Sequence, residues 1–278
     1  MKTIYHFSGA GNDFVVIDGR EGNVSAFREV ARIEALCKEY KTDGLMILGQ
    51  EMPGQAGHDG GSVMADPDRP SVDFTMEFYN PDGSGGMMCG NGGRCIVAFA
   101  DYLGIRPASG DVFLFRAPDG LHTGEILERP EDGLWEVCIK MIDVQGITPM
   151  LGGYFLNTGT RHFVKFVDDV EQVDIDMEGK ALRWNEAFAP IGTNVNFVHI
   201  APDDLHVRTF EKGVEGETLA CGTGLTACAL VAHHAGVPAA TPGAYRLRAR
   251  QDWLSVSFTP GADEKFTDVY LTGPARLL

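Results

Sequence analysis

The sequence predicts an α+β protein built from one unit that occurs twice. In each half, runs with a period of two, typical of strands, lead to a glycine-flanked cysteine and then to an apolar helical segment. The two helical segments, CGNGGRCIVAFADYLG (89–104) and CGTGLTACALVAHHAG (221–236), align without a gap at an offset of 132 residues. Such self-similarity indicates a duplicated fold with one central helix in each half.

A second and weaker match supports the duplication. The segment YHFSGAGNDFVV (5–16) lies over YFLNTGTRHFVK (154–165). The coincidences are Tyr5 with Tyr154, Phe14 with Phe163 and, upstream of the helices, Phe78 with Phe210. Because both matches occur in the same order along the chain, we interpret them as one repeated unit rather than as chance similarity.

Five runs read as strands because apolar or β-branched residues alternate along them and polar residues bound them. In chain order they are DFVVID (13–18), VDFTMEFY (72–79), HFVKFVDD (162–169), NVNFVHI (194–200) and LHVRTFE (205–211). Residues 52–71 are rich in Gly, Asp and Pro, and we expect them to form a long surface loop.

The two repeated segments read as helices that begin at their cysteines. From Ile96 and from Thr226 onward the residues are apolar on nearly every side, which predicts helices buried centrally and wrapped by sheet. Gly104 and Gly236 then end the helices as C-caps, since glycine adopts the left-handed conformation without strain.

Length and charge exclude several classes of protein. With 278 residues, 44% of them apolar, the chain can fill the cores of two domains. The formal net charge of −16, with Lys and Arg scattered singly, argues against a nucleic-acid partner. The apolar runs are far too short to cross a bilayer, and the N-terminus has no signal-peptide core. We therefore expect a cytoplasmic protein without a membrane partner.

The cysteines and glycines do not match the motifs of metal, disulfide or nucleotide sites. Pairs of cysteines around the two helices leave five and six residues between their thiols, whereas zinc sites use C-x-x-C. The glycine runs either lack the third glycine of the dinucleotide fingerprint or do not follow a buried strand, and no lysine has a Schiff-base context. We expect no cofactor and no metal. Four cysteines are expected to be small buried hydrophobes: Cys37, Cys95, Cys138 and Cys228.

Cys89 and Cys221 differ from the other cysteines because glycine follows each directly at the start of a helix. A helix N-terminus carries roughly half a positive charge, which lowers a thiol pKa from about 8.5 toward neutrality, and its N–H groups hold carboxylates. Two such thiols can remove a proton from a carbon and return one to the opposite face. A redox-sensing disulfide in a non-enzymatic binding protein is an alternative reading of the pair.

These residues resemble the diaminopimelate epimerase family. The resemblance rests on GAGNDF, FYNPDGSGGMMCGNGGRC, GTRHFV, NVNF, FEKGVEGETLACGTG and VYLTGPARLL, in matching order. It implies two pseudo-symmetric domains, each a curled, mostly antiparallel sheet around a central helix, with the active site between them. The implied domains are 1–123 with the returning strand 267–278, and 124–266.

The resemblance also implies an activity. Family members invert one α-carbon of LL-2,6-diaminopimelate to give the meso isomer, in lysine and peptidoglycan biosynthesis, with no pyridoxal phosphate or metal. The expected partner is a small amino-acid substrate, and a homodimer is kept open as the assembly.

Roles follow position by position from the same resemblance. Cys89 and Cys221 match the two acid/base thiols, and His162 and Glu211 match residues that tune them. The groups that match substrate contacts are Gly90, Asn91, Gly222 and Thr223 for the α-carboxylate, and Asn12, Asn80, Asn194, Glu211 and Lys212 for the remainder. Ordinary structural roles stay open for four of these: turn formers for Asn12 and Asn80, a core histidine for His162 and a helix-approach charge for Glu211.

Three positions depart from the family pattern. Asp43-Gly44 stands in place of Asp-Gln, Thr160-Arg161-His162 in place of Asn-Pro-His, and Glu211-Lys212 in place of Glu-Arg. An arginine fork binds a carboxylate through two parallel hydrogen bonds, whereas lysine is a point charge. The chemistry is therefore more firmly indicated than the substrate, and a related cofactor-independent racemase or epimerase acting on another amino acid is the alternative.

Overall fold

The computed structural model describes residues 3–50, 70–86, 88–241 and 243–278, and the chain forms two compact units. Unit 1 comprises Met1–Ile139 and Ala275–Leu278, and unit 2 comprises Lys140–Pro274. Most of the expected surface loop, residues 52–69, lies outside the described residues.

The division between the units comes later than the sequence suggests. The expected boundary after residue 123 falls inside β6 (Gly120–Glu131), which pairs with β7 (Leu134–Lys140) on one side and with β5 (Val112–Ala117) on the other. These pairings keep both strands in unit 1, so the unit continues to Ile139. Of the expected returning strand, residues 275–278 belong to unit 1.

Unit 1 is a mixed sheet whose neighbouring strands follow chain order. Its strands before β6 are β1 (Ile4–Gly9), β2 (Asn12–Asp18), β3 (Gly44–Gly49), β4 (Phe74–Tyr79) and β5 (Val112–Ala117). Its helical segments are η1 (Ser25–Arg28), α1 (Val30–Tyr40) and α2 (Gly90–Tyr102). The pairs β2–β3 and β4–β5 are parallel and the other neighbours antiparallel. A helix lies in each parallel connection, because parallel strands need a crossover.

Unit 2 repeats this order of pairings. Its strands are β8 (Val144–Gln145), β9 (Thr148–Met150), β10 (Gly153–Asn157), β11 (Arg161–Phe166), β12 (Asn194–Ile200), β13 (Leu205–Glu211), β14 (Gly216–Thr218), β15 (Ala244–Arg248), β16 (Trp253–Pro260) and β17 (Lys265–Leu277), of which the part after Pro274 belongs to unit 1. Its helical segments are η2 (Val170–Gln172), η3 (Ile175–Gly179), α3 (Lys180–Arg183), η4 (Glu186–Phe188) and α4 (Gly222–His234). Here β11–β12 and β13–β15 are the parallel pairs. The shared order is what a duplicated unit predicts.

The gap-free alignment of the two units is nevertheless out by one residue at two places. Val15 pairs with Leu45, and Leu45 pairs with Tyr79. In unit 2 the equivalent row is Phe163, Val195 and Phe210. Val15 and Tyr79, rather than Phe14 and Phe78, are therefore the counterparts of the two phenylalanines, because the connecting turns of the two units differ by one residue in length.

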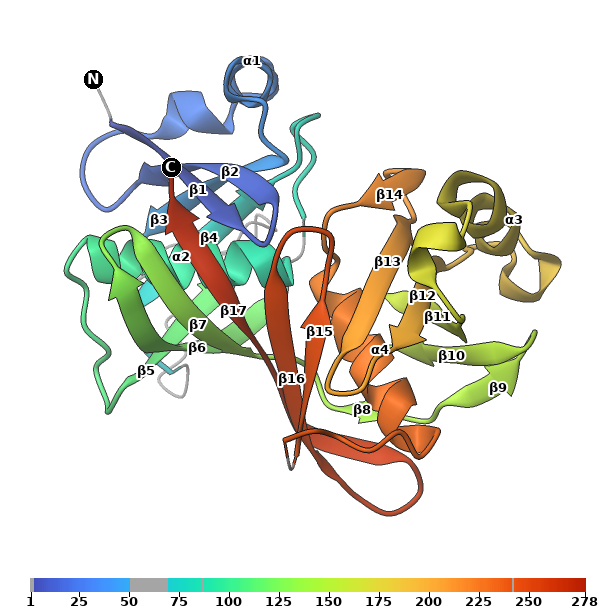
Figure 1. Ribbon diagram of the computed structural model, residues 1–278. Helices are drawn as coiled ribbons and strands as arrows, with labels where there is room; N and C mark the ends of the chain where they lie inside the picture. The colour runs from blue at the N-terminus through green and yellow to red at the C-terminus, as the bar shows by residue number, and fades with distance from the viewer. Residues whose placement is uncertain (1–2, 51–69, 87, 242) are drawn as a thin grey trace. The chain divides into compact units, whose positions relative to one another are not determined.

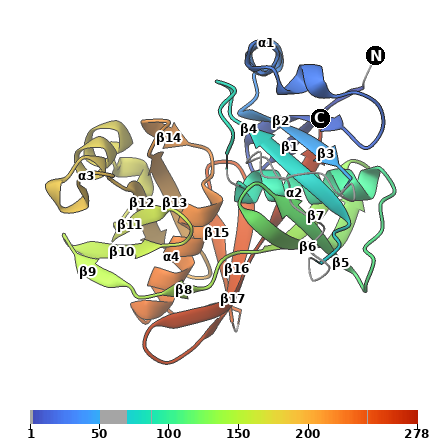
Figure 2. The same cartoon turned by 180° about the vertical axis from the view of Figure 1, so that it is seen from behind.

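The two central helices confirm the prediction drawn from their sequences. Each begins immediately after its cysteine, has 13 residues and is buried along most of its length. Gly104 and Gly236 follow the helix ends with φ of +76°, as expected of C-cap glycines. Within unit 1, α2 packs on strands including β1, β2, β3 and β6, and within unit 2, α4 packs on β10–β13 and β15–β16 (Figures 1 and 2).

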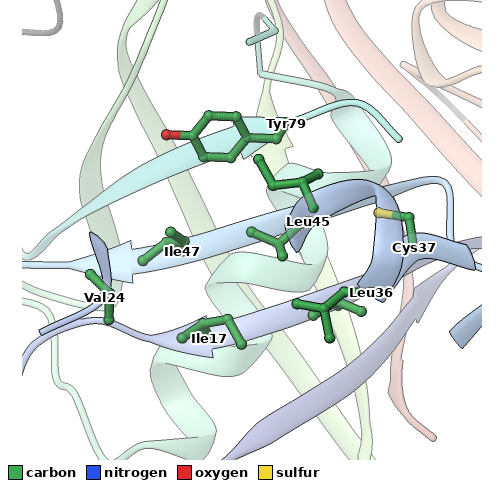
Figure 3. Close-up of a cluster of buried hydrophobic side chains, with 9 residues drawn as sticks. Ile17, Val24, Leu36, Cys37, Leu45, Ile47 and Tyr79 are labelled. Atoms are coloured by element: carbon green, nitrogen blue, oxygen red, sulfur yellow. The ribbon is translucent and has the colours of Figure 1, made fainter. Parts of the chain in front are cut away.

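The opposite face of each sheet is covered as well, which explains the nearly continuous apolar strands. In β2, Val15 and Ile17 pack with α1 in one cluster, in which Figure 3 labels Ile17, whereas Phe14 lies near Gly92 of α2. The cluster consists of Val15, Ile17, Val24, Ile33, Leu36, Cys37, Leu45, Ile47 and Tyr79. Strands buried on both faces lose the alternation of a half-exposed strand. Unit 2 has the corresponding cluster between β11–β13 and the segment η2–η4.

The last residues of the chain complete the sheet of unit 1. Leu277 pairs with Phe7 of β1, and its N–H donates to the carbonyl of Gly133 in the β6–β7 turn. The C-terminus thereby joins the first strand of the unit to its last hairpin. Among the described residues, no helix combines the length and hydropathy needed to cross a membrane.

Candidate active site

Cys221 occupies the N-cap position of α4. Its backbone is extended (φ −118°, ψ 108°) and the residue is 8% exposed. In the described residues no side-chain hydrogen bond caps α4. The first-turn N–H groups of a helix have no partners within the helix, so this end can bind an anion. Cys221 therefore lies where a thiolate and a carboxylate are both stabilised.

Thr223 connects Cys221 to His162. The Thr223 hydroxyl lies 3.4 Å from Cys221 Sγ and 2.9 Å from His162 Nε2. Thr160 Oγ1 lies 2.9 Å from the same ring nitrogen and 3.2 Å from Thr223 Oγ1. The backbone carbonyl of Thr223 also accepts a 2.9 Å hydrogen bond from Thr158, which fixes this turn to the end of β10. The Thr223 hydroxyl thus bridges the imidazole and the thiol, and the Thr160 hydroxyl contacts both the imidazole and Thr223.

Asn196 supports the imidazole from the other side. His162 is fully buried, and its Nδ1 lies 3.1 Å from Asn196 Nδ2. Burial lowers the pKa of His162 to about 3. An added Cβ on Gly224 would lie 2.5 Å from Asn196 Oδ1 and 3.3 Å from His162 Cε1, so α4 passes close to both side chains. His162 is therefore a buried neutral side chain in direct contact with the Cys221 network.

Asn194, at the start of β12, forms hydrogen bonds at the start of β11 and just after the end of β13. Its Nδ2 donates to the Arg161 carbonyl at 3.0 Å and to Thr160 Oγ1 at 3.3 Å, and its Oδ1 accepts from the Lys212 backbone N–H at 2.8 Å. Both hydrogens of this amide are used within unit 2. The side chain consequently positions Thr160 and Lys212 at the edge of the Cys221 network.

Glu211 and Arg161 each bond to a residue outside the Cys221 network. Glu211 Oε2 accepts a 2.9 Å hydrogen bond from Thr218 of β14. The Arg161 guanidinium lies 5.2 Å from the Phe155 ring centroid and donates to the Phe188 carbonyl at 3.3 Å. Because side chains alternate along a strand, Arg161 and its neighbour His162 project from opposite faces of β11. Arg161 therefore does not join the Cys221 network.

Cys89 begins α2 in the same manner. It is the N-cap, with extended backbone (φ −88°, ψ 134°), and is partly exposed. The preceding N–H, of Met88, donates to Asp119 Oδ1 at 3.0 Å, and His122 Nε2 lies 3.1 Å from that oxygen. Burial raises the pKa of Asp119, but the hydrogen bonds from His122 and Met88 outweigh it and the net direction is downward. Asp119 thus anchors the chain just before the thiol.

A line of hydrogen bonds runs behind the start of α2. Arg94 is fully buried and donates to Asn91 Oδ1 at 2.8 Å. Asn91 Nδ2 donates to Asn12 Oδ1, and Asn12 Nδ2 donates to Asp43 Oδ2 at 3.2 Å. An arginine only donates and a carboxylate only accepts, so the two ends fix the orientation of both amides.

Two further positions of unit 1 have clear structural roles. Asn80 lies in the turn after β4, where its Nδ2 donates to Ser84 Oγ at 3.0 Å and its backbone bonds to the same residue. A Cβ on Gly44 would lie 2.7 Å from the Tyr79 carbonyl oxygen. A side chain at position 44 would therefore require β4 to shift.

The remaining cysteines behave as the sequence suggests, with one exception. Cys37, Cys95 and Cys228 are buried, and burial raises the pKa of each thiol. Cys138 is only half-buried, because its side chain alternates with the buried Val137 and Ile139 along β7. All six cysteines lie in the described part of the chain, and none is joined in a disulfide. Within the described ranges no group of three or more His, Cys, Asp or Glu side chains could hold a metal ion.

Sequence reasoning missed three residues that support the candidate site: Asn196, Arg94 and Asp43. Asn196 follows Asn194 by two residues in a strand, so the period of two already placed both on one face. Arg94 follows Asn91 by three residues in a helix, a spacing that brings side chains together. The contact between Asp43 and Asn12 has no such signal, since the two residues are far apart in the chain.

Comparison with known proteins gives one consistent family. A family model described as diaminopimelate epimerase matches residues 154–277. The chain is 37% identical to the diaminopimelate epimerase of Chlorobaculum tepidum, over 97% of this chain and 96% of that one. It is 38% identical to the diaminopimelate epimerase of Aquifex aeolicus, over 97% of this chain and 93% of that one.

Solved structures with low sequence identity share the fold. A phenazine biosynthesis protein of the PhzF family from Bacillus anthracis superposes with a TM-score of 0.68 at 11% identity, covering 99% of this chain and 96% of that one. A hydroxyproline epimerase from Agrobacterium vitis gives 0.64 at 15% identity, covering 100% and 89%. These structures confirm the predicted α+β fold class.

Proposed function

Because the chain belongs to the diaminopimelate epimerase family, we propose that it inverts one α-carbon of LL-2,6-diaminopimelate to give the meso isomer. The predicted enzyme class, an isomerase, agrees with these relatives. One observation carries the proposal on this chain: each unit places a cysteine immediately before its buried central helix. Residues in that position have the electrostatic environment that a proton-transferring thiol needs.

The proposed reaction uses Cys89 and Cys221 as a pair of acid/base groups. The thiolate of one takes the α-hydrogen as a proton, which leaves a carbanion, and the thiol of the other donates its proton to the opposite face of that carbon. The enzyme then holds the reverse pair of protonation states, so the opposite direction uses the same two groups. No hydride or electron is transferred, and one proton enters for each that leaves.

The α-carboxylate takes up much of the charge that develops on the carbanion. We assign it to the first-turn groups around Gly90 and Asn91 of α2 and Gly222 and Thr223 of α4, because helix N-termini stabilise anions. Asn12 belongs with the donors of α2, since its orientation is fixed by Asp43. Such preorganised donors contribute about 2.7–4 kcal/mol each in other enzymes.

The distal end of the substrate is assigned to Lys212, with Asn80, Asn194 and Glu211 around it. Support for a grip different from the family's comes from Lys212, which stands where the family has arginine, since Arg161 packs on Phe155 and adds no second cation to the Cys221 network. A related epimerase or racemase of another amino acid is the second candidate, and this departure is the observation that favours it.

An assay with LL-diaminopimelate in deuterated water tests the proposal. The product should carry deuterium at the inverted carbon, while unreacted substrate stays largely protiated early on, because the second thiol has exchanged with solvent. Cys89→Ala and Cys221→Ala should each abolish inversion in both directions. The matched controls are Cys95→Ala and Cys228→Ala, which remove the buried thiol of the same helices and should retain activity.

Three results would contradict the proposal. Substantial epimerase activity in Cys89→Ala or Cys221→Ala would exclude the paired-thiol mechanism, as would intact transfer of the original hydrogen to the product. Inversion of another amino acid, with none of diaminopimelate, would favour the second candidate. Turnover that is absent both with and without a thiol reductant would favour the redox-sensor reading.

A further inference from the structure

The amide of Asn196 has only one possible orientation. Its Nδ2 lies 3.1 Å from the Phe163 carbonyl oxygen, which can only accept, and its Oδ1 accepts from Thr209 Oγ1 at 3.0 Å. Exchanging the two ends of the amide would set its oxygen against the carbonyl oxygen in a fully buried position. The –NH₂ group therefore faces both the Phe163 carbonyl and the His162 ring.

This orientation determines which nitrogen of His162 carries the hydrogen. One hydrogen of Asn196 Nδ2 goes to Phe163, and the second points at His162 Nδ1, 3.1 Å away. Nδ1 must accept it, because an N–H there would face another N–H in a buried site. A neutral imidazole with an unprotonated Nδ1 carries its hydrogen on Nε2.

The Nε2 hydrogen then sets the direction of the remaining hydrogen bonds. Nε2 lies 2.9 Å from both Thr160 Oγ1 and Thr223 Oγ1, so its single hydrogen is shared between these two hydroxyl oxygens, which both accept from it. Thr160 also receives a hydrogen from Asn194, which leaves its own hydroxyl hydrogen to donate to Thr223, 3.2 Å away. The Thr223 hydroxyl hydrogen is left to donate to Cys221 Sγ. Each donor in the series points toward the sulfur.

We propose that Asn196 and His162 are positioning residues that act through Thr223 to stabilise the Cys221 thiolate by neutral hydrogen bonds. The imidazole in this arrangement is a fixed donor, and it neither takes the Cys221 proton nor forms a thiolate–imidazolium pair. The inference rests on the proposed role of Cys221 as an acid/base group, which it deepens. The proton of Cys221 is then exchanged only with substrate or solvent.

The charged groups around the network are consistent with a neutral imidazole. By alternation, Lys165 of β11, His199 of β12 and Arg208 of β13 project from the face opposite His162. Glu211, at the end of β13, projects from the same face as His162 and is hydrogen-bonded to Thr218. A Glu211→Gln variant therefore accompanies the measurements, to separate its charge from the effect of the hydroxyls.

The tautomer is tested directly by nitrogen NMR on protein labelled at histidine, with His162→Gln used to assign the signal. We expect the pattern of a neutral ring with its hydrogen on Nε2, unchanged between about pH 5 and 9. Asn196→Asp, which offers Nδ1 a carboxylate instead of an N–H, should move the hydrogen to Nδ1 or protonate the ring. A wild-type ring with its hydrogen on Nδ1, or one that titrates in this range, would overturn the proposal.

The effect on the thiol is tested by the pH dependence of Cys221 alkylation, followed by mass spectrometry of the peptide. Thr223→Val should raise the pKa of Cys221 by about 1–2 units, since it removes a hydrogen bond to an ionised group. Thr223→Ser should restore the wild-type profile. The matched control is Thr226→Val, a buried threonine of the same helix whose hydroxyl bonds to the Gly222 carbonyl instead of to Cys221.

The outcomes separate this proposal from the proposed reaction. Neither NMR nor alkylation requires turnover, so a protein inactive on diaminopimelate can still confirm or refute the donor series. Equal alkylation profiles for Thr223→Val and Thr226→Val would refute it, as would a shift in Glu211→Gln as large as that in Thr223→Val. The donor series would be confirmed if the pKa of Cys221, read from alkylation, shifted only in Thr223→Val and Asn196→Asp and returned to the wild-type value in Thr223→Ser.

Discussion

Gly92 and Gly224 occupy the same position in the two central helices, the third residue after each cysteine, yet they should respond differently to alanine. In an open helix interior the change stabilises by about 1 kcal/mol, because alanine loses less conformational entropy. A Cβ on Gly224 would lie 2.5 Å from Asn196 Oδ1 and 3.3 Å from Cys221 Cβ. A Cβ on Gly92 would lie 3.2 Å from Met46 Sδ, with its next contacts at 3.6 Å or more.

The two contacts differ in how readily they give way. A methionine sulfur on a flexible chain can move by a few tenths of an ångström, so Gly92→Ala should be neutral or stabilising by up to about 1 kcal/mol. Asn196 is fully buried and held by hydrogen bonds to Phe163 and Thr209. Overpacking costs about 1–3 kcal/mol, so Gly224→Ala should be destabilising by about that range, less the gain in helix propensity.

Urea unfolding of wild type and both variants, with epimerase activity measured alongside, tests this difference. Gly224→Ala should unfold at lower urea and lose at least about tenfold in activity, since displacing Asn196 costs the hydrogen bond that orients His162. Gly92→Ala is the matched control for helix propensity. If Gly224→Ala were as stable and as active as Gly92→Ala, the close packing of α4 on Asn196 would be refuted.

Three further predictions follow from single positions. Gly44→Gln, which restores the family residue, should destabilise the protein by about 1–3 kcal/mol in urea unfolding, because Tyr79 approaches too closely, and a fully stable variant would contradict this. Since burial lowers the pKa of His162 to about 3, the unfolded state binds its proton first as pH falls from about 6.5, and stability drops by up to about 1.4 kcal/mol per pH unit. The free energy of unfolding of His162→Gln, measured from urea midpoints at several pH values, should fall less steeply with decreasing pH than that of the wild type. An identical dependence on pH would refute the low pKa of His162. Lys212→Ala, which keeps the backbone bond to Asn194, should weaken substrate binding by about 1.5–3 kcal/mol, seen as a raised KM, whereas an unchanged KM would place its ammonium outside the site.

Much of the fold followed from local patterns. The strands β12 and β13 match the runs NVNFVHI and LHVRTFE residue for residue, and both central helices begin at the predicted cysteines. Alternation and helix periodicity suffice for such elements, because each depends on neighbours in the chain. The residue-by-residue correspondence of the two repeats did not follow. A turn one residue shorter shifts a strand by one position without any signal in the residues of that strand.

The candidate site divides in the same way. Cys89, Cys221 and the glycines beside them were found from sequence, since a thiol at a helix start depends only on adjacent residues. Sequence reasoning missed the roles of three residues, Asp43, Arg94 and Asn196. Their roles depend on hydrogen bonds to other side chains of the candidate site.

The sequence by itself therefore determined the class of fold, the duplication and the two thiols at the helix starts, which all arise from short-range order. Only the tertiary structure decided the partners of those helix starts. It placed Asn196 against His162, turned Arg161 to the opposite face of β11 and brought Tyr79 against Gly44. Hydrogen-bond direction and steric fit depend on atoms that meet in space from distant parts of the chain, and residue spacing carries no record of them.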